Sequence, residues 1–128
     1  MGNGRIVVTF ILIAFLFWFL IAACVHECGH YLMARWYGYE AKITIRYWHM
    51  PVCVVKSDTL TLSYEQTSAI ALAGPVASAL LWLLTDTISP QLAMISLLIA
   101  VTNIIPFKFF GIKSDGYHIV ESAIKGSK

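Results

Sequence analysis

Two histidines and a glutamate form the pattern with the clearest chemistry in this sequence: His26, Glu27 and His30. Residues four apart on a helix share a face, so the imidazoles of His26 and His30 can bind one metal ion. Glu27 lies about 100° round the helix from His26 and roughly 60° from His30, so it can flank the metal without binding it. Two ligands and a general base are the arrangement of a zinc hydrolase.

This motif ends a long apolar stretch. Residues 6–25 carry no charged side chain, and ~20 such residues match one membrane span. We expect a first helix at about 6–37 and further spans at about 66–84 and 91–105. The chain is 59% hydrophobic and 12% charged, whereas a soluble domain is about 45–50% apolar and 25% charged. These numbers predict a single membrane-embedded domain over 1–128, and a net charge of +2 gives no indication of nucleic-acid binding.

Residues 41–63 have a different pattern from the helices. Polar and apolar side chains alternate at 42–48 and again at 59–63, which predicts short strands. The expected fold is therefore a mainly α membrane protein of three transmembrane helices, with a short β-strand segment between helices one and two. The strand at 42–48 offers an edge on which an extended peptide could pair, and a structural hairpin would give the same pattern.

The basic residues predict the orientation in the membrane. Three spans put the 38–64 loop and the 107–128 tail on one side, and eight of the nine Lys and Arg residues fall there when Arg35 is included. Only Arg5 lies on the other side. This is the positive-inside pattern. It predicts a multi-pass integral membrane protein, with the N-terminus outside and the tail cytoplasmic; the short chain suits a bacterial cell membrane.

A second interpretation of the N-terminus is a lipoprotein signal peptide cleaved before Cys24. Arg5, the apolar run and Ile21-Ala22-Ala23 precede that cysteine. The apolar run is longer than the usual ~7–15 residues, and cleavage would remove the helix that carries His26. We therefore favour a retained span.

A catalytic zinc has three protein ligands and an open position for water, so a third ligand is needed. The sequence offers Asp115, His118, His49, Glu65 and Asp86. Asp86 is predicted on the opposite side of the membrane and Glu65 at the start of a span. Asp115 follows the third helix on the same side as the motif, beside Gly116, which permits a close backbone approach. Asp-Gly is also a common turn signal, so these residues alone leave the choice open.

Three motifs, in order along residues 20–120, resemble the site-2 protease family of intramembrane zinc metalloproteases. The first is His26-Glu27-Cys28-Gly29-His30, which matches the family's first-helix motif. The second is Ala73-Gly74-Pro75, similar to the small-residue motif of its second core helix. The third is Asn103-x-x-Pro106 followed by Asp115-Gly116, similar to its Asn-Pro-Asp-Gly motif.

This resemblance implies that His26, His30 and Asp115 bind one Zn²⁺ per chain and that Glu27 is the catalytic base. It also implies that Asn103 lies beside the site, where it would bind the substrate backbone or the oxyanion.

The spacing before Asp115 departs from the family pattern. Eight residues, 107–114, separate Pro106 from Asp115, where the family commonly has four, so a longer loop must return Asp115 to the site. His118 would lie one turn from Asp115 on a following helix, as a partner of the ligands or an alternative ligand.

The expected activity is zinc-dependent cleavage in or near the transmembrane segment of a single-span membrane protein, that is, regulated intramembrane proteolysis. The other expected partner is the lipid bilayer; a regulatory membrane partner or a homo-oligomer stays open, and no PDZ or CBS domain is expected. One alternative is a catalytically inactive relative that binds zinc or a partner. Another is a small transporter or immunity-type protein with an interfacial metal site, although three spans without a repeat make a transport path hard to build.

Overall fold

The computed structural model describes residues 2–46, 49–56 and 62–127. Its apolar helices follow the predicted spans: α1 (Gly2–Trp36), α2 (Tyr64–Thr85) and α3 (Pro90–Ile104). α1 and α2 are long and apolar enough to cross a membrane, whereas α3 is apolar but has 15 residues. That length gives about 22 Å, less than the ~30 Å of a hydrocarbon core. The structure therefore supports two of the three predicted spans as candidates.

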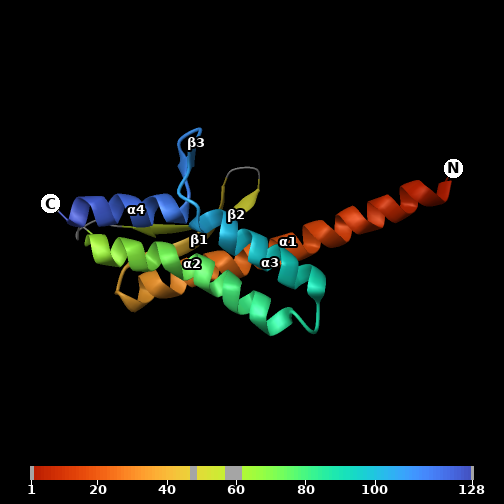
Figure 1. Ribbon diagram of the computed structural model, residues 1–128, viewed down its shortest axis with the longest axis horizontal. Helices are drawn as coiled ribbons and strands as arrows, with labels where there is room; N and C mark the ends of the chain where they lie inside the picture. The colour runs from red at the N-terminus through yellow and green to blue at the C-terminus, as the bar shows by residue number, and fades with distance from the viewer. Residues whose placement is uncertain (1, 47–48, 57–61, 128) are drawn as a thin grey trace.

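The N-terminal half of α1 extends away from the rest of the molecule (Figure 1). Its large apolar side chains from Ile6 to Phe17 are all half or more exposed. A helix that is apolar all round and has no protein cover suits the interior of a bilayer. Cleavage before Cys24, the alternative interpretation of the N-terminus, would cut α1 within its C-terminal half.

The C-terminal half of α1 packs on α2 and α3 through a stripe of residues spaced by four, with Ala22 against α3 and Ala34 against α2. Ala22, His26, His30 and Ala34 are all buried, because positions i and i+4 lie on one face of a helix. Small residues let α1 and α2 approach closely: a Cβ on Gly29 would collide with the carbonyl oxygen of Ala73. The histidines thus occupy the middle of the interface between α1 and α2.

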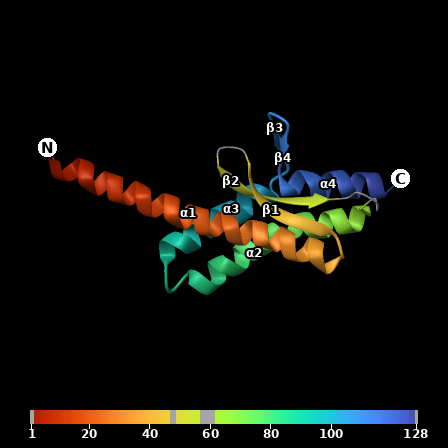
Figure 2. The ribbon, with the colours of Figure 1, turned by 180° about the vertical axis from the view of Figure 1, so that it is seen from behind.

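A β-hairpin follows α1 and lies along it (Figure 2). Strands β1 (Glu40–Arg46) and β2 (Met50–Lys56) are antiparallel, with Ile43 opposite Cys53. The predicted 41–63 segment is wrong at its last residue. Ser63 caps α2 through a capping box with Gln66 instead of ending a strand, because this pair satisfies free N–H groups at the helix start. Residues 47–48 and 57–61 lie outside the described residues.

The predicted tail contains a second hairpin and a helix. Strands β3 (Lys108–Phe109) and β4 (Ile112–Lys113) pair around Phe110 and Gly111, whose φ angles are 46° and 82°. Positive φ at both central residues is what a two-residue type I′ turn requires. Helix α4 (Asp115–Gly126) follows and packs beside the N-terminal half of α2, where Gly126 approaches Tyr64.

Gly29→Ala should destabilise the protein, because the added Cβ meets the Ala73 backbone and lies 2.8 Å from the Cβ of Ala77. Overpacking of this kind costs about 1–3 kcal/mol. Thermal unfolding in detergent measures the change. Gly4→Ala is the matched control in the same helix, because nothing lies within 4 Å of its added Cβ; equal melting temperatures for the two variants would show that the close helix contact is wrong.

Candidate metal centre

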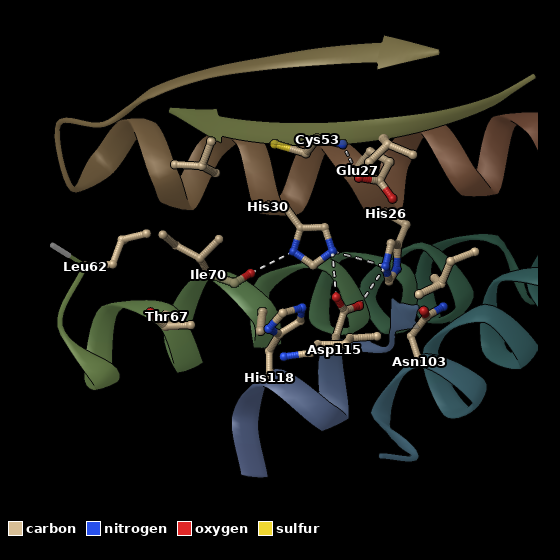
Figure 3. A pocket seen from close by; sticks show the side chains of 15 residues that line it. His26, Glu27, His30, Cys53, Leu62, Thr67, Ile70, Asn103, Asp115 and His118 are labelled. Atoms are coloured by element: carbon tan, nitrogen blue, oxygen red, sulfur yellow. Dashed lines mark hydrogen bonds and ion pairs between the residues drawn. The ribbon is translucent and has the colours of Figure 1, made fainter. Parts of the chain in front are cut away.

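Three side chains from two helices converge on one point (Figure 3). The Nε2 atoms of His26 and His30 lie 3.2 Å apart. The carboxylate of Asp115, at the start of α4, lies 3.0 Å from Nε2 of His26 and 3.4 Å from Nε2 of His30. The structure thus brings Asp115 to the histidine pair, although 89 residues separate it from His26 in the sequence.

Helix α2 holds the outer nitrogen of each imidazole. Nδ1 of His30 donates to the carbonyl oxygen of Ile70 at 2.7 Å, and Nδ1 of His26 lies 2.9 Å from the hydroxyl of Ser78. Gly74, midway between these two residues, leaves room for both rings, because a Cβ there would collide with His30 and lie 2.8 Å from Nε2 of His26. Gly74 of the sequence motif Ala73-Gly74-Pro75 therefore lies directly against both histidines.

The donor set suits a cation. A carbonyl oxygen only accepts, so Nδ1 of His30 carries the proton and Nε2 of the neutral ring presents a lone pair. The Asp115 carboxylate faces the same point, 3.0 Å from Nε2 of His26 and 3.4 Å from Nε2 of His30. Lone pairs and a carboxylate therefore face one another. Ligand atoms of His26, Glu27 and His30 also lie within 4.8 Å of one another, so this group could hold a metal ion.

Ser114 explains how the long loop after Pro106 returns Asp115 to the site. The β3–β4 hairpin contains most of the extra residues, and Ser114 joins its two ends. The Ser114 hydroxyl donates to the carbonyl of Ile105 at 2.8 Å and accepts from the N–H of Phe107 at 3.0 Å. It also accepts from the N–H of Tyr117, which caps α4. Gly116 then allows close contact with the Ile104 carbonyl, where any side chain would collide.

Glu27 is held by the backbone of β2. Its Oε2 accepts the N–H of Cys53 at 2.6 Å, so the carboxylate has a fixed position beside the histidines. The Cys53 thiol also lines the pocket. Burial and the nearby Glu27 carboxylate raise the pKa of Cys53 to about 11. The thiol therefore stays protonated at neutral pH, and a thiol is a poor metal ligand compared with a thiolate.

The remaining predicted residues divide into two groups. Asn103 and His118 line the same cavity of about 410 Å³; Nδ2 of Asn103 donates one proton to the Ile99 carbonyl and has a second proton to offer. His49 lies in the β1–β2 turn at a φ of 63°, Glu65 is exposed in the first turn of α2, and Asp86 caps the far end of α2. These last three are absent from the described lining of the cavity.

Four contacts at this site were not predicted: those of Ser78, the Ile70 carbonyl, the Cys53 N–H and Ser114. Two had a sequence signal. Ser78 lies four residues after Gly74, on the same helix face, and Ser114 precedes a helix start as a typical N-cap. The Ile70 and Cys53 contacts are made by backbone groups, for which the residue type is no guide.

No protein-family model matches this chain, and neither a curated protein nor a solved structure matches it. Its function is therefore inferred from the geometry of the site and from the three sequence motifs.

Ser114→Ala should destabilise the protein, because the substitution leaves the Ile105 carbonyl and two N–H groups without the partner that joins them. Loss of an N-cap and of buried hydrogen bonds costs about 1–3 kcal/mol. Thermal unfolding with helix content as the readout measures this. Ser122→Ala, at a buried serine in the same helix, is the control; a Ser114 variant as stable as the control would contradict the role of the hydroxyl.

Proposed function

We propose that this chain is a zinc-dependent intramembrane endopeptidase, similar to the site-2 proteases, that cleaves in or near a transmembrane segment of a membrane protein. One observation carries the proposal: Nε2 of His26, Nε2 of His30 and the Asp115 carboxylate are separated by 3.0–3.4 Å, with Glu27 beside them. The histidines lie within one apolar candidate span, α1, and against the other, α2, which supports a membrane substrate.

The spacing of the ligand atoms fits zinc. Donors at the corners of a tetrahedron with bonds of ~2.0–2.1 Å lie roughly 3.3–3.4 Å apart, close to the three separations in this site. Two imidazoles and one carboxylate are a ligand set of catalytic zinc, which keeps a fourth position for water. His26, His30 and Asp115 would be the ligands, one zinc per chain.

Each remaining residue then has a chemical role. When bound, zinc would polarise the scissile carbonyl and make a water molecule more acidic. Glu27 accepts a proton from the attacking water as the C–O bond forms, and returns it to the leaving amine as the C–N bond breaks. The Cys53 N–H holds one Glu27 oxygen and leaves the other for this transfer. The second Nδ2 proton of Asn103 is available to the substrate backbone or the oxyanion.

The free edge of β2 is the surface that we assign to the substrate backbone. Ile43 and Cys53 are opposite each other, and the Cys53 N–H points to Glu27 and away from β1. Backbone N–H groups two residues apart on a strand point in the same direction, so the N–H of Val55 also points to this edge. Pro51, which has no N–H, would point there too, so it removes no hydrogen bond to β1. The edge beside the site is therefore that of β2, whereas the sequence suggested the strand at 42–48. A helical substrate must be extended before it can pair there.

The arrangement of α3 and α4 suggests how a short helix completes a third crossing. The histidines lie against Gly74, which is 10 residues from Tyr64 and 11 from Thr85, at the middle of α2. α3 returns from the Thr85 end to this level, and α4 continues from Asp115 to the Tyr64 end. We infer that the two helices share the crossing, with the break at the site. Broken helices of this kind occur where backbone lines a cavity.

This arrangement is compatible with the orientation predicted from the basic residues, which would put the hairpin and the end of α4 on the cytoplasmic side. Water would enter from that side, because Thr67, Lys113 and His118 give the cavity a polar lining.

Glu27→Gln should retain zinc and lose cleavage, because the amide keeps the shape of the side chain but cannot accept the proton. Co-expression with candidate single-span membrane proteins, followed by gel analysis of the fragments, measures cleavage. Zinc content per purified chain is measured in parallel. Glu65→Gln, at an exposed carboxylate of α2, should cleave like the wild type.

Undiminished cleavage by Glu27→Gln would refute the assigned base. A wild type that binds zinc and cleaves none of the substrates tested would favour the zinc-binding or partner-binding alternative over the protease.

A further inference from the structure

Ser78 differs from the other hydroxyl residues inside the described helices. Most of these bond a carbonyl one turn earlier in their own helix, the common local pattern for Ser and Thr; they are Thr9, Thr67, Thr85, Ser96 and Thr102. The Ser78 hydroxyl instead lies 2.9 Å from Nδ1 of His26 on the neighbouring helix. Ser78 is 0% exposed, so water does not compete for this contact.

The two histidines are held by chemically different partners. The Ile70 carbonyl can only accept, so it keeps the proton of His30 on Nδ1 at all times. A hydroxyl can donate or accept by rotating about its C–O bond. Ser78 can therefore bond His26 in either tautomer. With the proton on Nε2, His26 donates to Asp115 at 3.0 Å; with the proton on Nδ1, its Nε2 is free for a metal.

We propose that Ser78 is a positioning residue that sets the metal affinity of the site by accepting the Nδ1 proton of His26 in the metal-bound state. The inference rests on the proposed zinc site but adds a residue to it. Zinc at Nε2 obliges the proton to reside on Nδ1, and Ser78 is the partner that the structure gives to that atom. Without the hydroxyl, the metal-bound form has an unsatisfied N–H in a buried site, whereas the metal-free form can move the proton to Nε2 and bond Asp115.

The test is the zinc dissociation constant of the purified full chain, measured by competition with a chromophoric chelator. Loss of such a partner typically weakens metal affinity about 10–100-fold, so Ser78→Ala should raise the dissociation constant by that factor. Ser96→Ala is a closely matched control, because Ser96 is also 0% exposed and bonds its own helix at the Leu92 carbonyl. Its dissociation constant should equal that of the wild type.

A double variant separates positioning from a general loss of packing. In a His26→Ala background, Ser78→Ala should cause no further change in zinc affinity, because the two residues act through one contact. Melting of the metal-free Ser78→Ala protein should match that of Ser96→Ala.

Equal zinc affinity for Ser78→Ala and the wild type would overturn the inference and leave the zinc site standing. An effect of Ser78→Ala that persists without His26 would also overturn it. A wild type that binds no zinc would overturn both this inference and the proposed function.

Discussion

The close contact between α1 and α2 at Gly29 and Gly74 determines the geometry of the two histidines, on which the rest of the site depends. Gly29 lets the helices approach, and Gly74 gives the two imidazoles the space that a side chain would fill. The contact places Ile70 and Ser78 of α2 against the outer nitrogens of the rings. Each ring is thus fixed from outside, and its Nε2 is directed to a common point. These two helices alone would offer a cation two neutral nitrogen ligands and no negative charge to balance its own.

The counter-charge comes from Asp115, and its delivery depends on the break between α3 and α4. A continuous helix from Pro90 onward would carry the chain past the site. The β3–β4 hairpin instead turns the intervening residues outward, and the Ser114 hydroxyl ties its ends together by two hydrogen bonds and caps α4 by a third. The first turn of α4 then presents Asp115 to the histidines while Gly116 packs on the end of α3. A longer loop is accommodated because only its two ends determine where Asp115 lies.

The sequence predicted the helical segments, the strand segment and the histidine pair, because each depends on local periodicity or on a spacing of four residues. It also pointed to Asp115 through its position after the third helix and through the resemblance, and the structure places this residue against both histidines. The prediction that α3 alone forms a third membrane span was not supported, since α3 ends at the site after 15 residues. The long predicted strand segment was wrong at Ser63, because helix capping outweighed the alternating pattern there. The Cys53 and Ile70 contacts could not be predicted, since they depend on the tertiary placement of backbone groups.

The central claim is that His26, His30 and Asp115 form one metal site from separate parts of the chain. Zinc titration of the purified full chain tests this most directly, with Asp115→Asn compared with Asp86→Asn, a carboxylate at the far end of α2. The account predicts one zinc per wild-type chain, a marked loss of affinity for Asp115→Asn and wild-type affinity for Asp86→Asn. Unchanged affinity for Asp115→Asn, or no zinc bound by the wild type, would contradict it.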